Sequence, residues 1–359
     1  MSDSSSPWSA VIPTYIDGKG EALVVSRDLP KGTRLLRVAP FAAVPYGKFL
    51  DSICSGCLQP CDEDGTLCAQ CGVVRHCSTC ARSFTGDAHS RHECFALQRL
   101  KNNDEGLTLA HDDLRLLLRV LSRRKKAIDD ETNAGEDTDE TNDDADEASP
   151  VNIEMDPVDP ATTAASNDSD LIVDCFADFD ELMSGTLGGD DGELPDSAIT
   201  TLTEVSKQCK FLVNAECRTS LDTYVSLLGK LQLNGFEITT AKAEGEGEQE
   251  NANEKSKKTK SGNPRTNSKN SKGIHAPIGL GVYPSAARFN HSCAPNCHQR
   301  FDEYACAVIE TNCAVKKGTE LTIPYVDINL DVTKRNERLV KNFAFSCRCG
   351  KCESERGKA

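Results

Sequence analysis

Cysteine and histidine residues gather between positions 54 and 94 in a spacing that suits metal binding. Three Cys-x2-Cys pairs are followed by a histidine and a further cysteine, so the candidate ligands are Cys54, Cys57, Cys68, Cys71, Cys77, Cys80, His89 and Cys94. Two cysteines separated by two residues can place both thiolates on one ion from a single tight turn, and two such pairs complete a tetrahedral zinc site. Eight ligands therefore predict two zinc ions, which would stabilise a segment too small and polar to fold on its core alone.

A shorter cysteine group follows near residue 350. Its spacing, Cys347-x-Cys349-x2-Cys352, supplies three ligands. A closed zinc site needs a fourth, and we expect Cys293 to supply it. The sequence thus predicts about three zinc ions in all.

Two polar motifs precede that group. Residues 290–296 read Asn-His-Ser-Cys-Ala-Pro-Asn, and residues 320–325 read Glu-Leu-Thr-Ile-Pro-Tyr. The Asn and His side chains of the first could exchange hydrogen bonds with a polar ligand, or could only cap a loop. The second predicts a strand that ends in an aromatic hydroxyl.

Both strands and helices are predicted to position these residues. Residues 9–53 predict short strands and turns. Leucines at helical spacing predict a helical segment at 95–128, and helical spacing returns at 198–240. The block 273–352 alternates apolar and polar residues between Gly and Pro turns, which predicts strands. The fold class is therefore α+β.

Two segments interrupt this pattern. No Lys or Arg lies between Lys126 and Lys207, so 129–197 is predicted to be an acidic disordered insert, with binding of cationic partners as a secondary role. Residues 241–272 predict a low-complexity linker. Its run Lys255–Lys260 is either a nuclear-import signal or an ordinary basic stretch of a linker.

Composition narrows the class of protein. The net charge of −15 argues against direct binding of nucleic acid through the whole surface. The first seven residues lack the basic and apolar regions of a secretory signal, and no run is apolar enough for a membrane span. We therefore expect a nuclear or cytoplasmic protein whose 18 cysteines bind zinc rather than form disulfides.

Together these motifs resemble the SET domain: Asn-His-Ser-Cys-x-Pro-Asn, then Glu-Leu-x3-Tyr, then a post-SET Cys-x-Cys-x2-Cys. Residues 54–94 resemble the MYND zinc finger, and its insertion after the first SET strands resembles the SET and MYND domain methyltransferases. The resemblance implies small SET β-sheets with a pseudoknot, a helical insert, a MYND module and a post-SET zinc site. It implies these segments: 9–53 and 273–330 (SET), 54–94 (MYND), 95–128 (helical), 129–197 (acidic insert), 198–240 (helical SET insert), 241–272 (linker) and 331–352 (post-SET).

The MYND resemblance also implies how the ligands pair. The family's interleaved order assigns one zinc to Cys54, Cys57, Cys77 and Cys80, and the other to Cys68, Cys71, His89 and Cys94. The third cysteine pair is one residue shorter than usual and the gap from His to Cys is one longer, so His92 or His76 could replace His89. Cys61 is interpreted as a spare thiol. The module is expected to bind zinc structurally, and a proline-rich peptide is its candidate partner.

The SET resemblance implies an enzyme that transfers methyl from S-adenosylmethionine to a lysine of a histone or another protein. The residues that match cofactor contacts are Gly18, Lys19, Gly20, Asn234, Asn290, His291, Tyr325 and Phe345. Tyr325 matches the catalytic tyrosine that orients the lysine amine. Phe343 stands where relatives often have tyrosine, which predicts a roomier channel or a weakened activity. The alternative is a catalytically degenerate SET and MYND scaffold for protein interactions.

Overall fold

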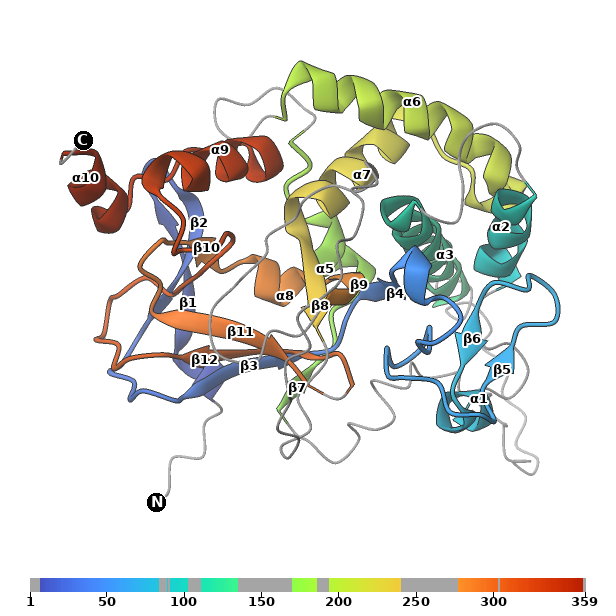
Figure 1. Ribbon diagram of the computed structural model, residues 1–359, viewed down its shortest axis with the longest axis horizontal. Coiled ribbons are helices and arrows are strands. Elements are labelled where there is room, and N and C mark those ends of the chain that lie inside the picture. Colours follow the sequence, from blue (N-terminus) through green and yellow to red (C-terminus); the bar gives the residue numbers. More distant parts are fainter. Residues whose placement is uncertain are drawn as a thin grey trace, which may run out of the picture.

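The computed structural model describes residues 7–83, 89, 91–102, 111–134, 170–185, 194–239, 277–302 and 304–357 (Figure 1). The predicted linker at 241–272, with its basic run, and most of the predicted acidic insert lie outside these residues.

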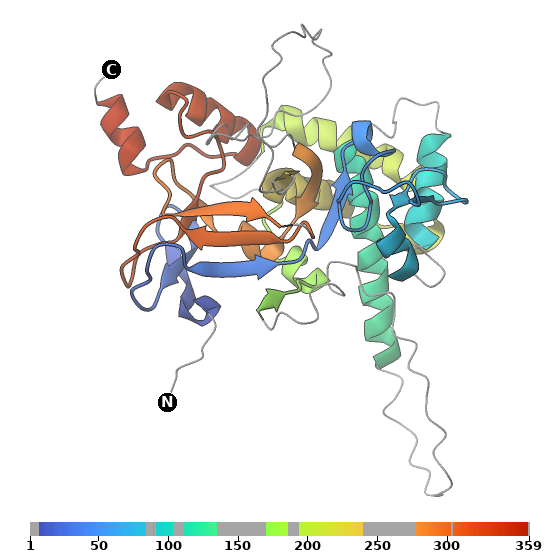
Figure 2. The ribbon, with the colours of Figure 1, turned by 60° about the horizontal axis from the view of Figure 1, so that its bottom comes forward.

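Strands from distant parts of the sequence form the sheets of one half of the molecule. Figure 2 shows β3, β11 and β12 side by side, and β7 completes this sheet in the order β11-β12-β3-β7. Its strands are β3 (Arg34–Val38), β7 (Leu171–Ile172), β11 (Cys297–Phe301) and β12 (Ala307–Thr311). A second sheet has the order β4-β9-β8, with β4 (Ala42–Pro45), β8 (Gly235–Thr239) and β9 (Pro277–Val282).

Two further strand pairs complete this half. β1 (Val11–Ile16) and β2 (Gly20–Val25) form an antiparallel hairpin. β10 (Asn290–His291) pairs in parallel with β13 (Thr322–Ile323), which joins the two polar motifs as the predicted pseudoknot requires. Buried apolar residues such as Val38, Phe289 and Ile309 form the core between these strands, and the α+β fold class is confirmed.

Helices form the other half. α6 (Asp196–Leu212) arches over α7 (Leu221–Asn234) along the top of Figure 1, and α2 (Arg91–Lys101) and α3 (Asp112–Ala134) pack beneath. The leucines at positions 114, 117, 118 and 121 are all buried, as their helical spacing predicted. Ser220 begins α7 as an N-cap, because its hydroxyl accepts a hydrogen bond from the Thr223 amide at 3.1 Å.

The cysteine-rich module lies at the right-hand end of Figure 1, opposite the C-terminal helices. Among its described residues it contains little regular structure besides the start of α2: β5 (Thr66–Leu67), β6 (Arg75–His76) and α1 (Ser78–Ser83). The short helix η2 (Gly47–Phe49) comes just before it. The preceding short helix η1 (Pro7–Ala10) and η3 (Ala215–Cys217) lie elsewhere in the chain. A segment so poor in secondary structure depends on other links, such as metal ligands, to hold its shape.

Part of the predicted acidic insert is ordered, so the prediction of disorder was wrong there. α3 continues to Ala134, and residues 170–185 contain β7 and α5 (Phe176–Asp180). The Phe179 ring is fully buried and stacks on Phe41 with ring centroids 5.2 Å apart. The acidic composition hid these aromatic residues, whose burial offsets the cost of ordering a short segment.

The C-terminal block is less β-rich than its alternation predicted. It contains α8 (Pro284–Ala287), α9 (Val332–Phe343) and α10 (Gly350–Arg356). The Asp331 side chain caps α9 by accepting from the Lys334 amide at 2.9 Å, and Ala344 ends it in the left-handed conformation with φ of 60°. No helix among the described residues is long and apolar enough to cross a membrane.

Candidate metal centres and active site

Two groups of four potential ligands occupy the cysteine-rich module. The first is Cys54, Cys57, Cys77 and Cys80, and the second is Cys68, Cys71, His89 and Cys94. Within each, the ligand atoms lie within 4.8 Å of one another; the Cys57 and Cys77 sulfurs are 3.8 Å apart, and those of Cys68 and Cys94 are 3.9 Å apart. A tetrahedral zinc ion with Zn–S bonds of about 2.3 Å needs sulfurs about 3.8 Å apart, so both groups fit zinc.

The structure also separates the three candidate histidines. His89 Nε2 lies 3.5 Å from the Cys71 sulfur, within the second group. His92 instead pairs its Nδ1 with the Asn214 amide at 2.7 Å, and His76, although buried, belongs to neither group of potential ligands. Cys61 packs against the first group without joining it, and burial raises the pKa of its thiol to about 11.

The third group joins two segments of the C-terminal half. Cys293, Cys347, Cys349 and Cys352 lie together, as the count of ligands predicted, and the Cys293 sulfur is 3.9 Å from that of Cys347 and 3.5 Å from that of Cys352. None of the 18 cysteines, all of which lie among the described residues, is in a disulfide. This donor set also fits a closed, structural zinc site.

Arg335 and Asn336 of α9 contact the third group, although neither belongs to a motif of the sequence. Arg335 is only 1% exposed; its Nε lies 3.2 Å from the Cys293 sulfur and one terminal nitrogen 3.4 Å from that of Cys352. Asn336 accepts the Cys347 amide at 2.8 Å. Four thiolates on a divalent ion carry a net charge of −2, so a buried guanidinium that donates to two of the sulfurs stabilises the bound state.

We expect the purified protein to contain three zinc ions per chain, one for each ligand group. Cys349→Ser should lower the count to two, because a thiolate ligand is lost from the third group. Metal analysis of the gel-filtered protein measures this. Cys61→Ser is the matched control and should leave three ions; a loss in that variant would contradict the assignment of Cys61 as a spare thiol.

Gly18, Lys19 and Gly20 form a glycine turn where β1 joins β2. Gly18 and Gly20 have φ of 70° and 77°, which only glycine adopts without strain. A Cβ at either position would meet no protein atom within 4 Å. The turn therefore presents open space on which a ligand can approach the backbone.

Glu320 connects this turn to the first polar motif. Its carboxylate forms an ion pair with Lys19 and accepts a hydrogen bond from the Asn290 amide at 3.1 Å, while that amide also donates to the Glu21 carbonyl at 2.8 Å. Asn296 fixes the same strand, since it donates to the Glu320 carbonyl at 2.8 Å and accepts from the Thr322 amide at 2.9 Å. Glu320, the first residue of the second polar motif, thus brings Lys19 and Asn290 together.

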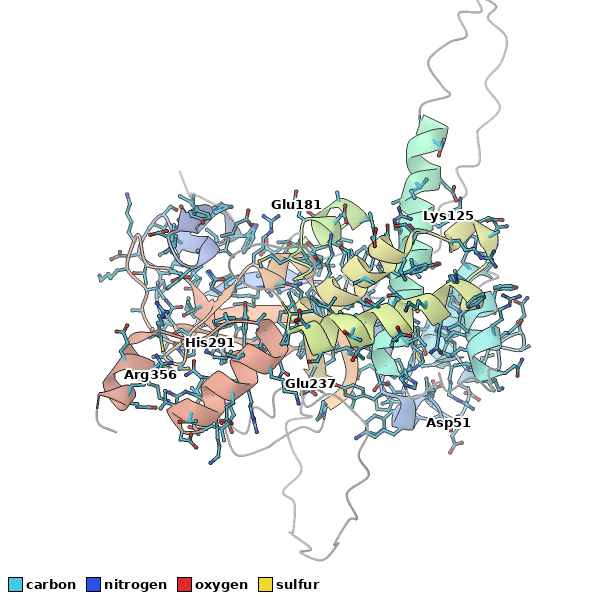
Figure 3. All side chains as sticks on the ribbon, turned by 90° about the horizontal axis from the view of Figure 1, so that it is seen from above. Asp51, Lys125, Glu181, Glu237, His291 and Arg356 are labelled. Carbon is cyan, nitrogen blue, oxygen red and sulfur yellow. The ribbon has the colours of Figure 1, made fainter. Side chains whose placement is uncertain are left out.

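Aromatic rings surround Tyr325 at the end of that strand. Its ring centroid lies 4.9 Å from that of Phe343, 5.4 Å from that of His291 and 6.3 Å from that of Phe345. Its hydroxyl donates to the Phe289 carbonyl at 2.6 Å. Burial and the negative charge of Glu320 raise the pKa of Tyr325, so the phenol stays neutral over the physiological range. Figure 3 places His291 at the end of the molecule that carries Arg356, far from Asp51 beside the cysteine-rich module.

Asn234 stands apart from this arrangement. It ends α7, and its amide donates to the Lys230 carbonyl at 2.8 Å and to the Met183 carbonyl at 3.0 Å. Its predicted contact with a cofactor stays a prediction.

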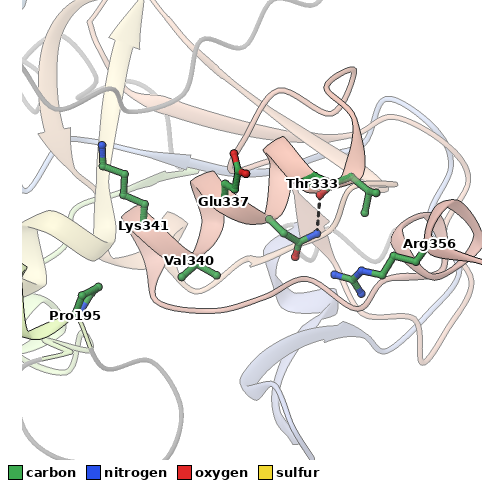
Figure 4. A pocket seen from close by; sticks show the side chains of 8 residues that line it. Pro195, Thr333, Glu337, Val340, Lys341 and Arg356 are labelled. Carbon is green, nitrogen blue, oxygen red and sulfur yellow. Dashed lines mark hydrogen bonds between the residues drawn. The ribbon is translucent and has the colours of Figure 1, made fainter. Parts of the chain in front are cut away.

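A shallow groove of about 580 Å³ lies on the outer side of α9, but none of the predicted cofactor or catalytic residues lines it (Figure 4). Its walls are Pro195, Val332, Thr333, Asn336, Glu337, Val340, Lys341 and Arg356. The hydrogen bonds and ring contacts around Tyr325 and Glu320, rather than this hollow, mark the candidate site.

Comparison with known proteins agrees with this arrangement. The model of the SET domain family matches residues 20–326. The chain belongs to the SET domain family. A SET and MYND domain-containing protein of Dictyostelium discoideum is 26% identical over 97% of this chain and 61% of its own length. The histone-lysine N-methyltransferase ASHR1 of Arabidopsis thaliana is 23% identical over 94% of this chain and 53% of its own.

The SET-family chain therefore spans between half and two thirds of these curated relatives. The human histone-lysine N-methyltransferase SMYD3 is 33% identical over a shorter stretch, 22% of this chain and 18% of its own. A solved SET domain of LSMT bound to lysine and AdoHcy aligns over 96% of this chain and 54% of that chain, with a TM-score of 0.38 and 13% identity. That likeness is too low for comparing sites residue by residue.

Proposed function

We propose that this SET-family protein is a protein-lysine N-methyltransferase that transfers methyl from S-adenosylmethionine to a lysine of a histone or another protein. One observation carries the proposal: Glu320 joins Lys19 of the glycine turn to Asn290, and the ring of the next residue, His291, packs against Tyr325. The names of ASHR1 and SMYD3 as histone-lysine N-methyltransferases support the same reaction.

The residues on the glycine side fit the chemistry of this cofactor. S-adenosylmethionine supplies an electrophilic methyl group on a positively charged sulfur. The open space beside Gly18 and Gly20 admits a ligand to the backbone, and the Glu320 carboxylate, with a side chain only 13% exposed, favours a cation nearby. We propose that Lys19, Asn290, His291 and Phe345 complete the cofactor site, and that Asn234 reaches it from the end of α7.

On the aromatic side, Tyr325 would act as the catalytic residue. Its hydroxyl proton is committed to the Phe289 carbonyl, so its oxygen is left to accept an N–H of the incoming lysine amine. That hydrogen bond orients the amine lone pair towards the methyl group. The rings of Phe343 and Phe345 exclude water, which favours the neutral amine over the ammonium form.

Binding of S-adenosylmethionine to the zinc-loaded protein, measured by calorimetry, tests the proposal. Asn290→Ala should weaken binding by about 10- to 100-fold, because it removes two hydrogen bonds that hold the turn and Glu320 in place. Asn214→Ala is the matched control, since it also loses two hydrogen bonds but lies beside His92. A folded wild type that binds no cofactor would favour the alternative, a degenerate scaffold.

Phe343 bears on how many methyl groups are added. We expect Phe343→Tyr to shift the product towards monomethyl-lysine, because a hydroxyl next to Tyr325 narrows the channel and can bond the amine. Mass spectrometry of a methylated lysine peptide measures the ratio. A wild type that makes monomethyl-lysine alone would contradict the roomier channel.

We further propose that the segment division given by the sequence describes the functional modules, and that the protein acts in the nucleus or the cytoplasm. The MYND module at 54–94 would dock proline-rich segments of partner proteins. Phe95 of α2 and Phe211 of α6 expose 37% and 61% of their surface beside it, and exposed aromatic rings are what such peptides bind.

A further inference from the structure

The imidazole of His291 joins the third cysteine group to Tyr325. Its Nδ1 accepts the backbone N–H of Tyr325 at 3.0 Å, and its Nε2 lies 3.3 Å from the Cys293 sulfur. The ring is buried, with 9% of its surface exposed. Both partners of the ring therefore lie inside the protein, and neither is water.

These contacts decide which nitrogen carries the proton. A backbone N–H can only donate, so Nδ1 must present its lone pair to Tyr325. The proton of the neutral ring then lies on Nε2 and is directed at the Cys293 sulfur. A thiolate bound to a metal remains a hydrogen-bond acceptor, and such N–H···S contacts orient metal ligands.

Tyr325 is held at two points by one short stretch of chain. Its amide bonds to His291 and its hydroxyl to the Phe289 carbonyl. The Ser292 amide also donates to the Ile323 carbonyl at 3.2 Å. Any shift of Cys293 would therefore move the imidazole and, with it, the backbone of Tyr325.

We propose that His291 is a positioning residue whose side chain couples the third metal centre to Tyr325. This inference rests on the proposed methyl transfer for its effect on rate, but not for its geometry. When the metal holds Cys293, the sulfur fixes Nε2 and the ring fixes the Tyr325 amide, so the hydroxyl meets the lysine amine at a constant place. The His291 side chain thus positions Tyr325, which would meet the substrate lysine. The backbone of His291 remains available to the cofactor.

The first test reads the ring directly. Long-range proton–nitrogen NMR of the zinc-loaded protein should show His291 neutral and protonated on Nε2. A ring protonated on Nδ1 would overturn the proposal, because it could not accept the Tyr325 amide. This measurement needs neither cofactor nor substrate, so it stands even where methyl transfer is not detected.

A matched pair of variants then tests the contacts of Nδ1 and Nε2 one at a time. The oxygen of Asn sits near the position of Nδ1, and the amide nitrogen of Gln sits near that of Nε2. His291→Asn should weaken zinc at the third group by about 10-fold, as measured by chelator competition, and should also lower kcat, because Cys293 no longer fixes the side chain that accepts the Tyr325 amide. His291→Gln should keep zinc affinity but lower kcat by about 10- to 100-fold, because the Tyr325 amide loses its acceptor.

Equal losses of zinc affinity in the two variants would mean that the ring only fills space, and would overturn the coupling. Failure of the wild type to bind S-adenosylmethionine would instead sink the proposed function while leaving the nitrogen and zinc measurements to decide the role of His291. The two failures are therefore distinguishable.

Discussion

Tyr325→Phe should lower kcat for lysine methylation by about 100- to 1,000-fold, the range for losing one group that is preorganised at a reacting centre. The variant removes only the oxygen that would accept the lysine amine. The ring contacts with Phe343 and Phe345 remain, so the Kd of the cofactor should change little. Steady-state kinetics with a lysine peptide and calorimetry of cofactor binding measure the two effects separately.

Tyr283→Phe is the matched control for this substitution. The Tyr283 hydroxyl also donates to a backbone carbonyl at 2.6 Å, that of Ala305, but it lies in the core between the sheets. Its loss should reduce the free energy of unfolding by about 0.5–1.5 kcal/mol and leave kcat alone. If the wild type and Tyr325→Phe had equal kcat values, the Tyr325 hydroxyl would not be catalytic.

Arg119→Met should reduce the free energy of unfolding by about 3–5 kcal/mol, because it leaves a buried carboxylate without its partner. Arg119 of α3 reaches Glu93 of α2 at 2.9 Å, and Glu93 is only 4% exposed. Burial alone would raise the pKa of Glu93, but the charge of Arg119 lowers it overall. The same guanidinium donates to the carbonyls of Ala43 and Ser55, so it also fixes the MYND module against the sheet that contains β4.

Denaturant unfolding of the zinc-loaded protein measures this effect. The double variant Glu93→Met with Arg119→Met should be less destabilised than Arg119→Met alone, since no charge is left buried. Arg91→Met is the surface control: Arg91 pairs with Glu216 at 3.2 Å, but the side chains are 71% and 52% exposed, so its loss should cost about 0–1 kcal/mol. A cost for Arg119→Met as small as that of Arg91→Met would show that the ion pair contributes little.

Local spacing was enough to predict which residues gather into groups of potential metal ligands. Cysteines two residues apart can place both thiolates on one ion, and the incomplete group near residue 350 needed a fourth member, and Cys293 lies beside that group. Which histidine joins the second group was left open, because the spacing of this segment departs from the MYND pattern at two places. The structure groups His89 with Cys68, Cys71 and Cys94, while His92 pairs with Asn214.

Segments without a local pattern were predicted less well. Residues 170–185 are acidic, yet Phe179 packs against Phe41, which lies far away in the sequence. α9 lies in a block that was expected to form strands, and its Leu339 is buried in one cluster with Cys293, which comes much earlier in the sequence. In both cases long-range packing overrode composition.

The sequence by itself pointed to the residues that could carry chemistry. The groups of potential metal ligands follow from residue type and spacing, while Gly18, Gly20, the two polar motifs and Tyr325 were singled out by their resemblance to the SET domain. Only the tertiary structure decided how those residues act on one another. It placed Glu320 between Lys19 and Asn290, Arg335 against two cysteine sulfurs and the His291 ring between Cys293 and Tyr325. The physical reason is that hydrogen bonds and ion pairs depend on distances and directions between residues far apart in the chain, which residue spacing does not contain.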